Sequence, residues 1–258
     1  MSSIIHINAN SGRGEKKMYR RDYLLRLIEE MTQMIGKAMG LREQKKRTEL
    51  LFEWDELMQR RFRINGELSD KLSADDMMRL FMTNGRLHAD ELQAFAFLLF
   101  ERAKLEKEKG LHEDEERHLD SRLEGVELGQ AEAMYIRRSM KALNLLLEAM
   151  LHGSDRKVLP VMPSMEQLLH ELKPYKLEES ALARLWRWFE QEGRYAEAED
   201  ALFHWLQSAA ERPDELQLRK KLAHGFYERM EALPDEQLEQ GRLPRDEIKQ
   251  GMEDVSSL

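Results

Sequence analysis

The chain has 258 residues, of which 41% are hydrophobic and 35% charged, and its net charge is −8. This balance favours a packed helical protein over a disordered one, because strong helix formers dominate and only 6 prolines interrupt them. The absence of cysteine excludes disulfides, thiolate nucleophiles and cysteine-bound metals. The sequence contains no apolar run long enough for a membrane span and no signal peptide, so we expect a cytoplasmic protein without membrane contact.

Helical periodicity dominates the first 151 residues after a polar, aperiodic start. We expect residues 1–17 to be a flexible leader and residues 18–151 to form an N-terminal helical subdomain. Ser73 followed by Asp76 predicts an N-terminal helix cap, and Gly110 is expected to end a helix. The apolar spacing predicts helices at about 21–40, 50–62, just after Ser73, 89–109, within 112–128 and 131–151.

Residues 152–163 are the predicted domain boundary, since they contain two prolines and one glycine and have no helical period. A C-terminal helical subdomain is expected over residues 164–232, beginning with a capping box at Ser164. Its helices are predicted at about 164–172, 178–192, 195–210 and from Pro213 onward. Residues 233–258 are expected to be a peripheral tail with two short helical pieces.

The segment 181–213 resembles one tetratricopeptide repeat. The matching positions are Leu182, Phe189, Gly193, Tyr195, Ala198, Leu202 and Pro213. Trp186 and Trp205 depart from the motif, because they stand where the repeat has small residues. The resemblance implies an all-α fold of stacked antiparallel helical hairpins, a tetratricopeptide-like α-solenoid with degenerate repeats, and a groove for a partner. A side chain at Gly193 is expected to crowd the helix crossing.

The first part of the chain resembles an uncharacterised bacterial family of all-helical proteins of unknown function. The resemblance covers residues of about 18–151 and rests on the segments Arg21–Glu29, Leu72–Asp76, Asn84–Leu87 and Lys141–Ala149. It implies a helical fold, itself distantly similar to tetratricopeptide repeats. It implies no activity.

Histidine and acidic residues form one polar cluster, His112 to His118, with a histidine and a glutamate at helical spacing. A di-iron bundle would need a second E-x-x-H motif, and a zinc protease would need H-E-x-x-H, and the sequence contains neither. We therefore expect a solvated helix face and predict no catalytic, cofactor-binding or metal-binding residues. A metal-binding or enzymatic helical protein that uses this cluster is one alternative. The i, i+4 pairs Asp200/His204 and Glu148/His152 predict helix-stabilising contacts.

Basic residues outnumber acidic ones in the first 63 residues. The basic block consists of Lys16, Lys17, Arg20, Arg21, Arg42, Lys45, Lys46, Arg47, Arg60, Arg61 and Arg63. A nucleic-acid-associated regulator is therefore a second alternative. Nucleic acid is not the expected partner, because acids are interleaved with this block, no recognition-helix pattern is present and the whole chain is acidic. A solvated or charge-pairing face is the preferred interpretation.

The densest aromatic group lies around Trp186 and Trp188. Because two residues that are two positions apart on a helix do not share a face, one of the two tryptophans is expected to be partly exposed. We predict Trp186 and Trp188, with the neighbouring Arg184 and Arg187, as partner-binding residues. The predicted function is a non-enzymatic scaffold or adaptor for a protein or peptide, and a homo-oligomer is compatible with it.

Overall fold

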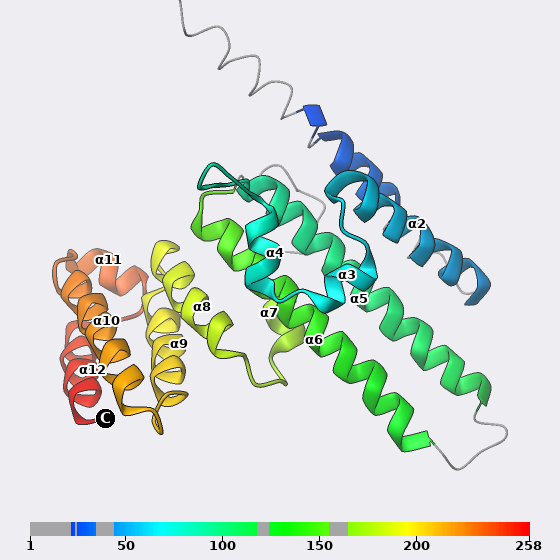
Figure 1. Ribbon diagram of the computed structural model, residues 1–258. Coiled ribbons are helices and arrows are strands. Elements are labelled where there is room, and N and C mark those ends of the chain that lie inside the picture. Colours follow the sequence, from blue (N-terminus) through cyan, green and yellow to red (C-terminus); the bar gives the residue numbers. More distant parts are fainter. Residues whose placement is uncertain (1–21, 24, 35–43, 118–123, 155–164) are drawn as a thin grey trace, which may run out of the picture.

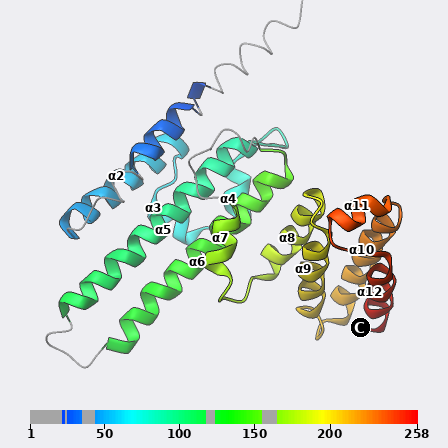
Figure 2. The same cartoon turned by 180° about the vertical axis from the view of Figure 1, so that it is seen from behind.

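The computed structural model describes residues 22–23, 25–34, 44–117, 124–154 and 165–258, and these ranges are almost wholly helical. The helices are packed side by side from α2 (Gln44–Phe62) at one end to α12 (Arg245–Ser257) at the other (Figure 1). The view from behind shows the same order (Figure 2). The predicted all-α fold is confirmed. No helix in the described ranges is both long and apolar enough to cross a membrane.

A long antiparallel hairpin, α5 (Ala89–Arg117) and α6 (Glu124–Leu151), forms the centre of the N-terminal part (Figure 1). α2 packs on α5, and the helical residues 22–23 and 25–34 add Leu27 and Met31 to the same core. α5 continues through position 110 to Arg117, so the predicted helix end at Gly110 and the separate helix within 112–128 are wrong. A glycine inside a helix costs only about 1 kcal/mol, and the packing of α5 against α6 outweighs it.

Short elements connect α2 to α5: α3 (Gly66–Lys71), α4 (Ala74–Leu80), β1 (Met82–Thr83) and β2 (Arg86–Leu87). The predicted cap at Ser73 is confirmed, because its Oγ accepts a hydrogen bond from the Asp76 N–H at 3.0 Å. Asn84 and Gly85 have φ values of 51° and 73° and join β1 to β2 in a two-residue turn. An Asn-Gly pair with positive φ at both residues is the preferred connection of a tight β-hairpin.

α6 is the helix around which α4, α5, α7 and α8 pack. All residues from Ser139 to Leu147 are buried, on every face of the helix. The reason is that α4, α5, α7 and α8 surround it. A helix buried on all sides is typical of the centre of a helical protein.

The C-terminal part begins with α7 (Met165–Leu172), which packs on α6. α8 (Glu179–Gln191) packs against α6 and against α9 (Tyr195–Gln207), with which it forms a hairpin. These two helices and α10 (Pro213–Glu231), with Pro213 in its first turn, correspond to the predicted helices. The predicted leader 1–17, Ser164 and residues 155–163 of the predicted boundary lie outside the described residues. The described helices on both sides of that boundary share one apolar core.

The last 25 residues form α11 (Asp235–Gln240) and α12, and α12 packs on α10. Ile248 and Val255 of α12 are buried. Gly251 lets α12 approach closely, because a Cβ there would lie 2.5 Å from Glu199 Oε1. Glu199 in turn accepts a hydrogen bond from Tyr227 Oη at 2.6 Å. These contacts connect the three helices α9, α10 and α12.

Gly193 joins α8 to α9 in a left-handed backbone conformation, with φ +72°. The expectation that a side chain would crowd this turn is wrong, because a Cβ would meet only Tyr195 Oη, at 3.9 Å. Glycine is required here by its φ angle, since L-residues with a side chain disfavour this region. The glycine that is crowded at this turn is Gly241, where a Cβ would lie 2.8 Å from the carbonyl oxygen of Gly193.

Replacement of Gly193 tests this assignment. Gly193→Ala is expected to lower the free energy of unfolding by about 1 kcal/mol, because the Cβ of alanine makes a backbone conformation with positive φ strained. The matched control is Gly225→Ala, inside α10, where the nearest atom to a Cβ is Arg229 Nη1 at 3.5 Å. The control is expected to raise stability by about 0.5 kcal/mol. Urea denaturation measures both, and equal stabilities for the two variants would contradict the assignment.

Candidate functional site

Both predicted partner-binding tryptophans are buried: Trp186 is 3% exposed and Trp188 is 4% exposed. The centroid of the Trp186 ring lies 6.2 Å from that of Trp205 in α9 and 6.3 Å from that of Phe226 in α10. The Trp188 ring lies 5.1 Å from Phe189. The expectation that one tryptophan is partly exposed is wrong. α8 packs against α6 as well as α9, so two different faces of the helix are covered.

The two arginines next to these tryptophans differ in their surroundings. Arg184 is bound within the chain: its Nε donates to Glu148 of α6 at 2.7 Å and its Nη2 to Asp75 of α4 at 2.8 Å. Arg187 is exposed, and its guanidinium lies 5.2 Å from the centroid of the Trp186 ring. Of the four predicted residues, Arg187 therefore presents its side chain to solvent, while Arg184 connects α8 to the N-terminal helices.

A groove of about 950 Å³ lies between α7, α8 and α9. Its apolar lining comes from α7, α8 and the loop between them: Leu169, Leu172, Leu177, Leu182 and Phe189. Polar and charged residues lie around it: Glu166, His170, Lys173, Lys176, Arg194, Glu197 and His204. Since Leu172, Leu182 and Phe189 are buried and most of the polar residues are exposed, the groove has an apolar base and a polar rim. Its volume is typical of ligand sites.

One side of α7 faces the groove, and the other side packs against α6. Leu168 is buried and does not line the groove, whereas Leu169, His170 and the buried Leu172 line it. The loop after α7 is held by Tyr175, whose Oη donates to Glu132 of α6 at 2.9 Å. α6 therefore positions α7 and its loop opposite the α8–α9 hairpin.

Arg194 bridges two of the groove's elements. It pairs with Glu166 of α7, and its Nε donates to Glu197 of α9 at 2.5 Å. Its guanidinium lies 4.5 Å from the centroid of the Phe189 ring. The hydrogen bond from Arg194 lowers the pKa of Glu197, and the same carboxylate raises the pKa of Arg194. Both carboxylates that line the groove are thus engaged by a single cation.

The other basic side chains of the rim have no such partner. Within the part of the chain that the structure describes, Lys173, Lys176, His170 and His204 form no ion pair or hydrogen bond through their side chains. The predicted helix pair of Asp200 with His204 is therefore not formed. The other predicted pair is confirmed, because Nδ1 of His152 lies 3.4 Å from Glu148 Oε1.

The resemblance to a tetratricopeptide repeat implied a groove for a partner, but it predicted neither the position nor the lining of this groove. Its residues come from positions 166 to 208, and helical periodicity does not report which of these positions meet. Glu166, Leu169, His170 and Lys173 have the i, i+3, i+4, i+7 spacing of one helix face, which is the single sequence signal for the α7 side. That signal does not reveal that α9 lies opposite.

The alternative sites fall largely outside the described residues. The side chains of His112 to His118 are not among them, so a role for this cluster stays a prediction. Among the side chains that are described, no group of three or more His, Asp or Glu residues has a metal-binding arrangement. From the basic block, Arg60 and Arg61 pair with Glu30, in agreement with a charge-pairing face.

These features define an all-α protein of packed antiparallel helices with a groove between α7 and the α8–α9 hairpin. The sequence matches the family described as "Family of unknown function (DUF6483)" over residues 18–258, and the chain belongs to this family. The match extends beyond the predicted range of 18–151 and includes the groove. Searches of curated proteins and of solved structures each found no significant match.

The burial of the tryptophans predicts their role in stability. Trp186→Ala and Trp188→Ala are each expected to lower the free energy of unfolding by about 3–5 kcal/mol, because each leaves a large cavity in the core. Leu218→Ala, at a leucine that is 60% exposed on α10, is the control and is expected to change it by less than about 0.5 kcal/mol. Chemical denaturation measures all three. A tryptophan variant as stable as the control would contradict the packing of α8.

The Arg194–Glu197 pair predicts a pH-dependent contribution to stability. Because the pKa of Glu197 is lowered in the folded protein, the pair stabilises the fold above the ordinary glutamate value of 4.5. This contribution is lost as the pH falls through the folded-state pKa. Glu197→Gln is therefore expected to be less stable than the wild type at pH 7, with a difference that shrinks below pH 4.5.

Thermal unfolding between pH 7 and pH 3 measures this difference. Glu253→Gln, at an exposed position of α12, serves as the control variant. A stability difference for Glu197→Gln that stays constant or grows on acidification would contradict the role of the ion pair.

Proposed function

We propose that this protein is a non-enzymatic scaffold or adaptor that binds another protein or a peptide in the groove between α7, α8 and α9. The observation that carries the proposal is the groove itself, with an apolar base of leucine and phenylalanine side chains beneath a polar rim. Peptides bind such grooves by inserting apolar anchors while their polar groups contact the rim.

The packing around the groove supports this function, because it fixes the groove before a ligand arrives. Trp186 and Trp188 are buried on either side of α8, and Arg184 connects this helix to α6. Arg194 links α7 to α9. A binding surface on rigid helices loses little conformational entropy when a ligand binds.

The arrangement of helices also supports a scaffold. The α8–α9 hairpin coincides with the segment that resembles a tetratricopeptide repeat, and stacked hairpins of this kind present concave binding surfaces. The absence of cysteine in the sequence agrees with a reducing compartment, so we place the protein in the cytoplasm.

Selection from a random 12-residue peptide library displayed on phage, with the full chain as target, tests the proposal. We expect enriched peptides whose binding depends on the groove. Leu169→Glu puts a charge among the apolar lining, and Gln207→Trp fills the groove from an exposed position of α9 without changing the core. Either variant is expected to weaken the recovered peptides by at least about tenfold, which corresponds to about 1.4 kcal/mol.

Leu222→Glu, at an exposed leucine of α10 outside the groove, is the matched control and is expected to leave binding unchanged. Circular dichroism establishes that each variant is folded. The proposal is overturned if no peptide is enriched, or if both folded groove variants bind the enriched peptides as the wild type does.

A further inference from the structure

We infer that the ligand of the groove is an acidic segment of another protein, in which aspartate or glutamate residues flank leucine- or phenylalanine-type anchors. This inference rests on the proposed function and names the chemical class of the partner. Two features of the groove lead to it: the apolar base and the imbalance of charges on the rim.

The apolar base determines the anchors. Leu172, Leu182 and Phe189 are buried at the base, and Leu169 and Leu177 are partly buried beside them. No charged group of the described lining lies unpaired among these side chains. A segment that gains free energy there must insert aliphatic or aromatic side chains, since burial of apolar surface is the main source of affinity at such a base.

The rim determines the charge of the segment. Glu166 and Glu197 both pair with Arg194, so neither carboxylate is left without a cationic partner, and the three groups together carry a net charge of −1 against the two lysines of the rim. Lys173 and Lys176 are exposed and without a partner within the described residues. The rim therefore offers two free ammonium groups to a ligand and no free carboxylate.

Two histidines extend this basic character across the groove. His170 lies on α7 and His204 on α9, and both are exposed on the rim without a partner in the described chain. Imidazole N–H groups donate hydrogen bonds to carboxylates. An acidic segment would thus find donors on both sides of the groove, whereas a basic segment would meet the ammonium groups of Lys173 and Lys176.

The net charge of the whole chain, −8, makes this local basic rim selective. The overall field of the protein attracts cations and repels anions, so an acidic segment gains from the protein's charges only where basic side chains gather. Complementary charges at a rim set orientation and specificity, while the apolar base supplies most of the affinity.

Synthetic versions of the groove-dependent peptides from the library selection test the inference by fluorescence polarisation. We expect these peptides to carry net negative charge, and replacement of their Asp and Glu by Asn and Gln to weaken binding by about tenfold. The double variant Lys173→Glu/Lys176→Glu is expected to weaken the acidic peptides by at least as much. It is also expected to bind the corresponding Lys-substituted peptides more tightly than the wild type does.

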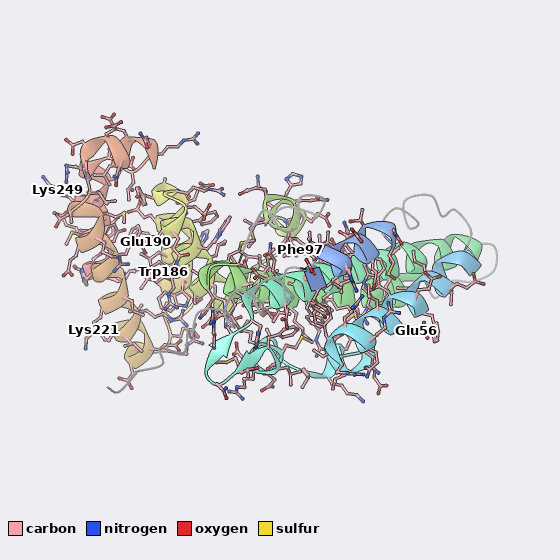
Figure 3. All side chains as sticks on the ribbon, turned by 90° about the horizontal axis from the view of Figure 1, so that it is seen from above. Glu56, Phe97, Trp186, Glu190, Lys221 and Lys249 are labelled. Atoms are coloured by element: carbon pink, nitrogen blue, oxygen red, sulfur yellow. The ribbon has the colours of Figure 1, made fainter. Side chains whose placement is uncertain are left out.

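Lys221→Glu/Lys249→Glu is the matched control, with the same change of net charge. These two lysines are exposed on α10 and α12, at the C-terminal end of the molecule and outside the groove (Figure 3). The control is expected to change the affinity by less than about twofold at 150 mM salt, where the Debye length of about 8 Å screens distant charges. Equal effects of the two double variants would overturn the inference, because binding would then follow net charge and not the rim.

The outcomes separate the inference from the proposed function. If peptides bind in a groove-dependent manner but are neutral or basic, or if their amide versions bind equally well, the acidic partner is wrong and the binding function stands. If the enriched peptides ignore Leu169→Glu and Gln207→Trp, the proposed function itself fails, and the inference fails with it.

Discussion

The burial of α6 on every face is the constraint on which the rest of the structure depends. An unpaired polar group is costly in a helix surrounded in this way, and two of the buried polar side chains of α6 have partners. Asn144 donates from Nδ2 to the Met140 carbonyl at 3.1 Å, and Lys141 donates to the Ser69 carbonyl at 2.5 Å. Burial lowers the pKa of Lys141. The Lys141 contact joins α6 to α3, whereas the bond from Asn144 to Met140 lies within α6.

Arg184 extends this constraint into the C-terminal part. It donates from Nη1 to Asn144 at 3.1 Å and from Nε to Glu148, so α8 is held in one register on α6. The opposite face of α8 packs on α9, where Arg219 of α10 binds the Trp205 carbonyl and the carboxylate of Glu179. A chain of buried or half-buried arginines thus links successive helices.

The basic side chains on the rim of the groove differ from the arginines that connect the helices, because some of them have no partner within the described chain. Arg184 and Arg219 each bind carboxylates or carbonyls of neighbouring helices, so their charges are neutralised or hydrogen-bonded within the folded protein. In the groove, Arg194 has the same structural role between Glu166 and Glu197. Lys173 and Lys176 have no such role within the described chain. The proposed recognition therefore depends on two ammonium groups that are unpartnered among the described residues and lie above an apolar base.

The sequence by itself determined the local structure of this protein. Apolar spacing located most helices. Ser73 marked the N-terminal cap of α4, Pro213 the start of α10 and Gly193 the turn between α8 and α9, because these signals act over a few neighbouring residues. The end of α5 was missed, since the intrinsic cost of a glycine is smaller than the gain from packing along α6.

Only the tertiary structure decided which surfaces are covered. Periodicity shows that α8 has apolar residues on more than one face, but not that α6 and α9 cover Trp186 and Trp188 together. The same holds for the groove, whose lining joins α7 to α9 across more than thirty positions of sequence. The energy of such contacts depends on the relative placement of whole helices, and this placement is set by all the packed side chains at once.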